Sequence, residues 1–242
     1  MRFLAIVAMS ASLLMAGCEK EENGDSTGGG NNNGGGNNGG GGSTTNAEWV
    51  DLGLPSGLLW ASCNVGATAP EDYGDYFAWG ETTTKTNYSL NTYRYGTVDA
   101  EGYLATLTKY NTSTNYGTVD TLTTLQSGDD AATANMGDGV RTPTLDEWSE
   151  LLDNTTAEWT ALNGVSGIKF TASNGKSIFL PAAGWYSSSV LLNAGDNGFY
   201  WSSSLDEDKP YRAHSFDFYS GDQYMYYVNR IHGISVRAVH QN

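Results

Sequence analysis

A tract of glycine, asparagine, serine and threonine divides this chain into two parts that cannot fold alike. Residues 23–46 contain almost nothing else, and 11 of the 31 glycines fall between Gly24 and Gly42. Such a segment buries too little apolar surface to offset the entropy cost of ordering it, so a flexible coil is predicted. About 22 residues of Gly-rich chain reach roughly 25 Å. We therefore interpret residues 18–46 as a tether and residues 47–242 as one folded domain.

The first segment has the pattern of a processing signal. Arg2 supplies a positive charge, residues 3–15 are almost uninterruptedly apolar, and small residues precede Cys18. The apolar run is shorter than the about 20 residues that span a bilayer. It resembles a bacterial lipoprotein signal, which implies a signal peptide at 1–17 and a lipid anchor on Cys18. A plain secretory peptide with an incidental cysteine is the alternative.

The charged run at residues 19–22, Glu-Lys-Glu-Glu, bears on where the domain is displayed. It resembles the short export signal that sends lipoproteins of the Bacteroidetes to the outside of the outer membrane. The resemblance implies an outer-membrane protein that is lipid-anchored and faces the cell exterior. The alternative is a solvated charge cluster that keeps the tether away from the lipid.

Charge and ligand spacing exclude several function classes. The chain has 27 acidic and 12 basic side chains, a formal net charge of -15, and no Lys/Arg stripe. Its field repels phosphate backbones, so we expect no nucleic-acid partner. The histidines and Cys63 lack the spacing of zinc ligands, and Asp129-Asp130 lacks that of a calcium loop. We expect no cofactor and no metal site, although bound calcium stays open.

Two short helices are predicted from their capping residues. Asp129 and Asp130 precede the run Ala131–Met136, where a carboxylate can accept the first backbone N–H groups. Thr144 stands three residues before Glu147, which is a capping box. The helix that follows places Leu145, Trp148, Leu151 and Leu152 on one apolar face.

Most of the remaining domain is predicted as short strands. Strands are expected at 58–60, 76–79, 169–172, 177–181, 200–203, 214–218, 223–228 and 234–239. Asn174-Gly175 is the strongest hairpin turn. Residues 81–127 are interpreted as a long ordered excursion on the surface. The predicted class is α+β, with two short helices packed on antiparallel strands.

Several motifs, in order along the chain, carry a resemblance to a known family. They are VDLGLPSGLLWASCNVGA at 50–67, EDYGDYFAWGET at 71–82, DDAA at 129–132, RTPTLDEWSELL at 141–152, LPAAG at 180–184, YWSSS at 200–204 and SVRAV at 235–239. Together they resemble the Fibrobacter succinogenes major paralogous domain, which is grouped with the C-type lectin fold. The resemblance implies a C-type-lectin-like domain. It implies no particular ligand.

The last third of the domain has the composition of a binding surface. Tyr, Ser, Asn, Asp and Gly dominate its predicted loops; tyrosine offers contact area with few rotors, and the small polar residues adapt their hydrogen bonds. We predict a non-catalytic, adhesin-like protein that binds an extracellular glycan or protein. The candidate ligand-binding residues are Trp185, Tyr186, Asn197, Tyr211, His214, Asp222, Tyr224, Tyr226, Asn229 and His232.

Three other functions compete with this prediction. One is a structural or tip subunit of a surface appendage. A second follows from the fold resemblance: some proteins of that fold are diversified by retroelements, which would vary Tyr211, His214, Asp217, Tyr219, Asp222, Tyr224, Tyr226, Asn229, Ile231 and His232. The third is a hydrolase acting on glycans, which needs two paired carboxylates. No such pair stands out, and Cys63 lies in a strand-like stretch that favours a small buried residue over a nucleophile.

Overall fold

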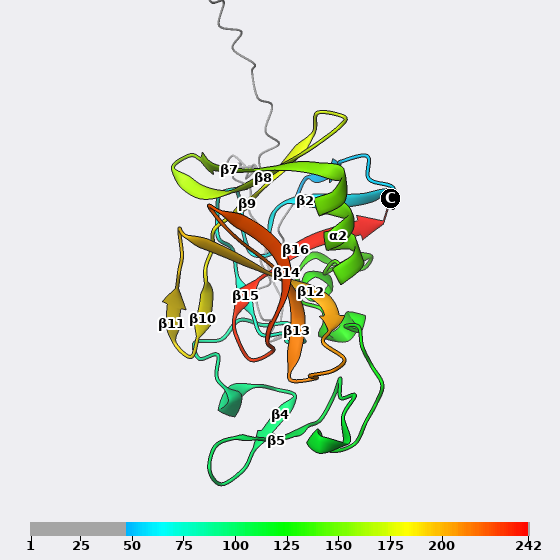
Figure 1. Cartoon of the computed structure of the whole chain (residues 1–242), viewed down its shortest axis with the longest axis vertical. Coiled ribbons are helices and arrows are strands. Elements are labelled where there is room, and N and C mark those ends of the chain that lie inside the picture. The colour runs from blue at the N-terminus through cyan, green and yellow to red at the C-terminus, as the bar shows by residue number, and fades with distance from the viewer. Residues whose placement is uncertain (1–46, 242) are drawn as a thin grey trace, which may run out of the picture.

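The computed structural model describes residues 47–241, and strands in five sheets dominate this part of the chain (Figure 1). One sheet has the order β1 (Trp49–Asp51), β2 (Leu58–Asn64), β16 (Arg237–Gln241), β6 (Val140–Arg141). The largest has the order β14 (Asp222–Asn229), β13 (Arg212–Tyr219), β12 (Asn197–Leu205), β15 (Ile234–Ser235), β3 (Tyr76–Phe77). The third consists of β7 (Thr155–Leu162), β8 (Val165–Ala172) and β9 (Ser177–Pro181).

Two hairpins and a few short helices complete the described residues. The hairpins are β4 (Gly96–Val98) with β5 (Leu104–Leu107) and β10 (Trp185–Ser187) with β11 (Val190–Leu192). The α-helices are α1 (Ala131–Met136) and α2 (Leu145–Asn154), and 3-10 turns lie at Leu90–Thr92, Thr114–Tyr116 and Ser127–Asp129. The pairings between these strands are antiparallel except that of β12 with β15, and an isolated bridge between Gly184 and Gly198 is also parallel. In Figure 1 the β10–β11 hairpin stands beside the five-stranded sheet, and β4–β5 extends from the opposite end to β7–β9.

The prediction of an α+β, C-type-lectin-like domain with two short helices packed on antiparallel strands is wrong. Residues 47–241 are mostly β, arranged in several small sheets, and the two α-helices have 6 and 10 residues. Strand β7 was not predicted although Ala157, Trp159 and Ala161 alternate with polar residues, because only one of the three is a large apolar residue and β7 follows α2 without a turn signal. The single strand predicted at 234–239 is in fact two, because the chain passes from one sheet to another at Val236.

The predictions that rested on local chemistry are confirmed. Asp130 caps α1, and its Oδ1 accepts hydrogen bonds from the backbone N–H groups of Ala132 and Thr133. Strands β8 and β9 form a hairpin around Asn174-Gly175. In both cases a short segment contains all the atoms that make the interaction, so tertiary packing has little to override.

The capping box of α2 is present and extends to an ion pair. Thr144 Oγ1 accepts from the backbone N–H of Glu147 at 3.3 Å, and Glu147 Oε2 accepts from the backbone N–H of Thr144 at 2.8 Å. The guanidinium of Arg141 donates to both carboxylate oxygens of Glu147, at 2.6 and 2.5 Å. The start of α2 is therefore tied to the end of β6.

Thr144→Ala is expected to lower the free energy of unfolding by about 1 kcal/mol, because it leaves a backbone N–H of the first helical turn without its acceptor. Urea denaturation measures the change. Thr144→Ser is the matched control, since it keeps the hydroxyl, and it should cost less than half as much. Equal losses in the two variants would show that the methyl group, and not the cap, stabilises this site.

Two aromatic clusters make up the core. In one, the Trp148 ring of α2 stacks on Phe216 of β13 at 5.0 Å and meets Trp60 of β2 edge-on at 4.9 Å. In the other, Trp79 and Trp201 pack with Phe77 and the tyrosines of the excursion. The five-stranded sheet separates the clusters, because alternate residues of β12 and β13 point to opposite faces. Both faces of this sheet are therefore largely buried.

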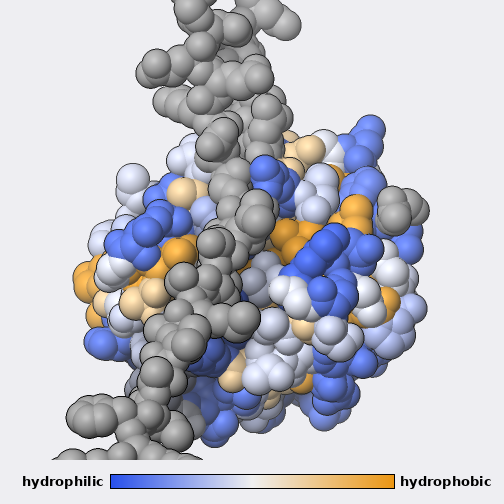
Figure 2. Space-filling model, turned by 90° about the horizontal axis from the view of Figure 1, so that it is seen from above, coloured by the Kyte–Doolittle hydropathy of each residue, from blue (hydrophilic) through white to orange (hydrophobic). Residues whose placement is uncertain are grey.

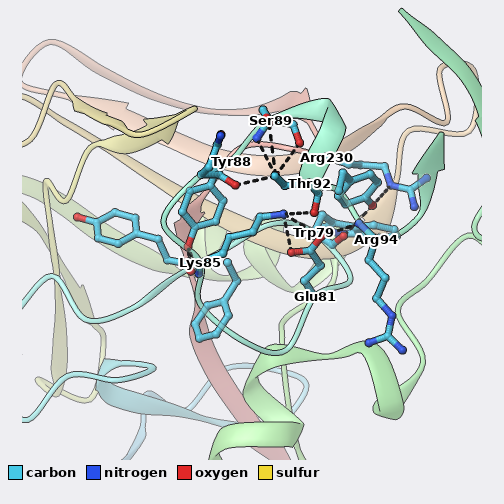
Figure 3. A network of polar contacts seen from close by, with 12 residues as sticks. Trp79, Glu81, Lys85, Tyr88, Ser89, Thr92, Arg94 and Arg230 are labelled. Atoms are coloured by element: carbon cyan, nitrogen blue, oxygen red, sulfur yellow. Dashed lines mark hydrogen bonds and ion pairs between the residues drawn. The ribbon is translucent and has the colours of Figure 1, made fainter. Parts of the chain in front are cut away.

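Residues 81–127 form an ordered excursion that polar contacts hold in place (Figure 3). Lys85 Nζ donates to Glu81 Oε1 at 2.9 Å and to the carbonyl oxygen of Thr92 at 3.1 Å. The backbone N–H of Arg94 donates to the same Glu81 oxygen at 2.8 Å. Because the Glu81 carboxylate binds both Lys85 and the backbone of Arg94, the excursion closes on itself before it reaches β4.

Arg230 joins this excursion to the segment that follows β14. Its side chain is fully buried. Nε donates to the hydroxyl of Tyr93 at 2.8 Å, and Nη1 donates to the carbonyl oxygens of Tyr110 and Pro210 at 3.0 and 2.7 Å. Nη2 donates to the carbonyl oxygen of Lys109 at 3.1 Å. One buried cation thus satisfies carbonyl groups from separate parts of the chain.

Seen from above, the described surface has small apolar patches interspersed with hydrophilic residues, and no single broad apolar face (Figure 2). The most exposed large hydrophobic side chains are Tyr103, Val190, Tyr219, Tyr224 and Tyr226. Three of these five belong to the β13–β14 hairpin, which therefore concentrates exposed aromatic rings. Within residues 47–241, no helix has the length and apolar character needed to span a bilayer.

Candidate functional site

A cavity of about 350 Å³ lies between β10 of the β10–β11 hairpin and the strands β12, β13 and β14. Figure 1 shows the hairpin beside the five-stranded sheet. Its lining residues are Trp185, Asn193, Phe199, Arg212, Asp217, Tyr226, Tyr227, Val228, Asn229 and His232. They come from four strands and two connecting segments. The lining mixes aromatic rings with a few polar groups, as is typical of small-molecule sites.

The alternation of β13 places Asp217 on this side of the sheet. Phe216 packs in the core on one face, and its neighbours Ser215 and Asp217 point to the other face. Asp217 lies opposite Phe199 of β12 and Tyr224 of β14 in the register. Directly opposite residues share a face, so aromatic side chains flank the carboxylate on both neighbouring strands.

Gly184 allows the hairpin that carries Trp185 to fold close to the sheet. Its φ is +66°, and a Cβ at this position would lie 2.2 Å from the carbonyl oxygen of Leu192. Only glycine fits such an approach. The backbone groups of Tyr186 and Gly233 then exchange two hydrogen bonds, at 2.7 and 3.1 Å. These contacts set Trp185 at the wall of the cavity.

His232 contributes a polar atom that has no partner within the described residues. Its ring meets the Trp185 ring edge-on, with centroids 4.6 Å apart. Nδ1 is buried without a hydrogen-bond partner. Burial lowers the pKa of His232 to about 4, so the imidazole is neutral at physiological pH. The protein itself encloses Nδ1, so a ligand in the cavity does not reach this atom in the present conformation.

Asp217 is the second buried polar group of the cavity. Its side chain is 4% exposed, and Ser215 Oγ donates to its Oδ1 at 2.7 Å. Burial raises the pKa of Asp217 to about 7, against the opposing effect of the Ser215 hydrogen bond. Within residues 47–241 no ion pair neutralises it. Ionisation of this buried carboxyl group therefore costs free energy in the folded protein.

Aromatic rings form the exposed rim. Tyr226 is 48% exposed; its ring meets that of Tyr224 edge-on at 5.9 Å and stacks with that of Tyr227 at 4.6 Å. The guanidinium of Arg212 lies over Tyr227 at 4.8 Å. Ordered rings of this kind present a large contact area with little rotamer entropy to lose.

The structure brings together some of the predicted ligand-binding residues and separates others. Trp185, Tyr226, Asn229 and His232 line the cavity, and Tyr224 is the ring neighbour of Tyr226. The other five lie elsewhere: Tyr186 packs against Tyr76 and Tyr88, Asn197 begins β12, Tyr211 packs against Tyr116, His214 lines another cavity, and Asp222 accepts from the backbone N–H of Gln223 at the start of β14.

Asp217, Phe199 and Arg212 were absent from the predicted ligand-binding set. The alternation of 214–218 does place Ser215 and Asp217 on the face away from Phe216. The pattern does not reveal that this second face is also buried. In the structure, Ser215 on that face is fully enclosed. Only the β10–β11 hairpin and the segment around His232, which are distant in the sequence, turn that face into a cavity.

The cavity that includes His214 has a volume of about 470 Å³ and a different character. Asp146, Asp206, Glu207 and Asp208 line it, together with Tyr227 and several small polar residues. Among residues 47–241, no group of three or more His, Cys, Asp or Glu side chains is arranged to hold a metal ion. Asp130, weighed as a calcium ligand, instead accepts from the backbone N–H of Thr142 at 2.9 Å and caps α1.

Comparison with known proteins identifies one family model. A domain of unknown function, DUF8237, matches residues 156–239. This segment runs from β7 into β16 and includes every residue that lines the cavity beside the β10–β11 hairpin. No curated protein and no solved structure matches the chain. The resemblance to the Fibrobacter succinogenes major paralogous domain stays a prediction.

Proposed function

We propose that this protein binds an extracellular glycan, without catalysis, in the cavity beside the β10–β11 hairpin. The observation that carries the proposal is the pairing of two kinds of group in one cavity. Asp217 is a buried carboxylate with unused hydrogen-bonding capacity, and Trp185 and Tyr226 present aromatic rings in the same cavity.

A sugar ring matches both kinds of group. Its C–H face can lie against an aromatic ring, while its hydroxyls both donate and accept hydrogen bonds. A hydroxyl can therefore donate a hydrogen bond to the ionised Asp217 carboxylate or accept one from its protonated form. A flat apolar ligand would leave this buried carboxyl group unsatisfied, which costs free energy.

The proposed location rests on the N-terminal segment. A lipid on Cys18 and a tether at 18–46 would hold the domain outside the cell, where polysaccharides and mucins are accessible. Cys18 and the tether lie outside the described residues. A protein ligand and a role as a subunit of a surface appendage are the other proposals, and the exposed tyrosines of β14 suit either one.

Binding is favoured over hydrolysis by the number of carboxylates in the cavity. Hydrolysis of a glycosidic bond uses two carboxyl groups on opposite sides of the scissile bond. Among the residues that line this cavity, Asp217 is the one carboxylate. Release of free sugar by the wild-type chain, abolished by Asp217→Asn, would replace the binding proposal with a catalytic one.

Trp185→Ala and Tyr226→Ala are each expected to weaken glycan binding about tenfold or more, because aromatic anchors carry most of the energy of such sites. A glycan and mucin array with the full chain identifies the bound sugars, and isothermal titration measures affinity. Tyr103→Ala is the matched control: Tyr103 is 72% exposed beside β5 and does not line the cavity. An array without binding, or equal losses in all three variants, contradicts the proposal.

A further inference from the structure

Folding alone does not explain why Asp217 is buried in this cavity. A carboxylate that is 4% exposed and has one hydrogen-bond donor, Ser215 Oγ, is far from saturated. Ionised, it offers about four lone-pair directions. A structural carboxylate in this chain looks different: Asp129 accepts from the hydroxyls of Tyr95 and Tyr110 and from Lys109.

We propose that Asp217 selects the ligand: as a carboxylate it accepts hydrogen bonds from neighbouring hydroxyls of an uncharged sugar whose ring lies against Trp185 and Tyr226. The proposal rests on the proposed function, because it names the class of sugar that the same site takes. It makes two claims, that the decisive polar contact is donated by the sugar and that the sugar carries no negative charge.

The geometry supports the first claim. Phe199 lies directly opposite Asp217 on β12, and the Phe199 ring is 6.1 Å from the ring of Trp185. Trp185 in turn contacts His232. Carboxylate, aromatic wall and imidazole therefore follow one another around a single cavity. A ring that packs on Trp185 brings its hydroxyls to the polar groups on either side.

Charge supports the second claim. An ionised Asp217 repels a uronate or sulfate, and His232 is neutral, so it provides no compensating charge. Arg212 is the cation of the lining, but it is five residues from Asp217 on β13, about 16 Å along an extended strand. Its guanidinium is stacked over Tyr227. The part of the cavity around Asp217 is therefore without a positive partner.

The affinity for sugar should depend on pH, because the ionised form of Asp217 is the form that binds. The titratable and charged groups that share the cavity face with Asp217 are Tyr224 and Tyr226 from β14, Arg212 from β13 and His232. Burial raises the pKa of Tyr224, away from neutrality, and lowers that of His232 to about 4, so neither changes charge between pH 5 and 8. Because the pKa of Asp217 is about 7, the binding form disappears on acidification. The apparent affinity should fall by up to tenfold for each pH unit below about 7.

The experiment uses the full chain and a fixed set of probes. Cellotetraose, xylotetraose, mannotetraose and β-1,4-galactotetraose are the uncharged probes, and tetragalacturonate is the acidic one. Affinities are measured by titration calorimetry at pH 5.5, 6.5 and 7.5 for the wild type, Asp217→Asn and Asp222→Asn. Asp222 is the matched control, since it is an exposed carboxylate at the start of β14 that does not line the cavity.

At least one uncharged probe should bind at pH 7.5, more weakly at pH 5.5, and at least tenfold more weakly to Asp217→Asn, with Asp222→Asn unchanged. Binding that Trp185→Ala abolishes but Asp217→Asn leaves intact overturns this inference and leaves the proposed function standing. Tighter binding of tetragalacturonate, or stronger binding at pH 5.5, also overturns the inference. If no probe binds the wild type, the proposed function fails with it.

Discussion

Arg230→Met is expected to be the most destabilising single substitution considered for this protein, with a loss of about 3–5 kcal/mol in the free energy of unfolding. The change leaves the buried carbonyl oxygens of Pro210 and Tyr110, and the partly buried one of Lys109, without their donor. It also removes the cation that lies 4.9 Å from the Trp79 ring (Figure 3). Each unsatisfied buried acceptor costs about 1–3 kcal/mol, so the losses accumulate.

The loss should concentrate in the excursion at 81–127, which Arg230 joins to the sheet. Limited proteolysis of Arg230→Met should cut within that segment under conditions that leave the wild type intact, and chemical denaturation gives the overall change. Arg94→Met is the matched control, because the same change at an exposed side chain should stay within about 0.5 kcal/mol. Comparable losses in both variants would contradict the anchoring role.

Asp217→Asn is expected to have the opposite effect and to stabilise the protein at alkaline pH. Ionisation of Asp217 in the folded state is unfavourable, because burial raises its pKa from 3.8 to about 7. A pKa unit corresponds to about 1.4 kcal/mol, so the penalty on the ionised form is roughly 4 kcal/mol. Asparagine keeps the shape and an oxygen that can accept from Ser215 without carrying the charge. The variant should therefore be more stable and bind sugar less well.

The sign of the pH dependence follows from proton linkage. Between pH 4 and 7 the folded state holds a proton on Asp217 that the unfolded chain has lost, so ionisation lowers stability as pH rises through this window. The advantage of Asp217→Asn should be near zero at pH 4, grow up to pH 7, and stay constant above it. Urea denaturation at several pH values measures it, with Asp222→Asn as a control that shows no such growth. A less stable Asp217→Asn at pH 8 would mean that the carboxylate has a structural role.

The elements that were predicted correctly are those whose interactions lie within a few residues. The Asp130 cap of α1, the Thr144–Glu147 capping box of α2 and the Asn174-Gly175 hairpin depend on atoms that are neighbours in the chain. Their energies come from local hydrogen bonds and turn geometry. Such features are readable from one sequence because they change little with the surroundings.

The fold class could not be read in the same way. The two helices have clear capping signals, whereas the alternation in β7 contains one large apolar residue and the hairpin β10–β11 has no alternation that marks it as strands. Their residues are only partly buried, and their pairing partners stabilise them. Strand formation depends on such partners more than helix formation does, so a mostly β chain with several small sheets was mistaken for α+β.

For the site, the aromatic composition of the last third indicated binding, and four of the ten predicted residues line one cavity. Tyr186 and Tyr211 looked equivalent to Tyr226 in the sequence but pack against other tyrosines. Composition identifies which residue types can recognise a ligand. It does not separate a tyrosine that covers the core from one that faces a cavity.

The Gly/Asn tract, the acidic charge and the short capped helices all follow from composition and near-neighbour chemistry, which the amino-acid order alone contains. The pairing of β12 with β13, the second buried face of β13 and the meeting of Asp217 with Trp185 and His232 do not. They depend on contacts between segments that are distant in the sequence, and the burial that shifts the pKa of Asp217 arises only when those segments pack together.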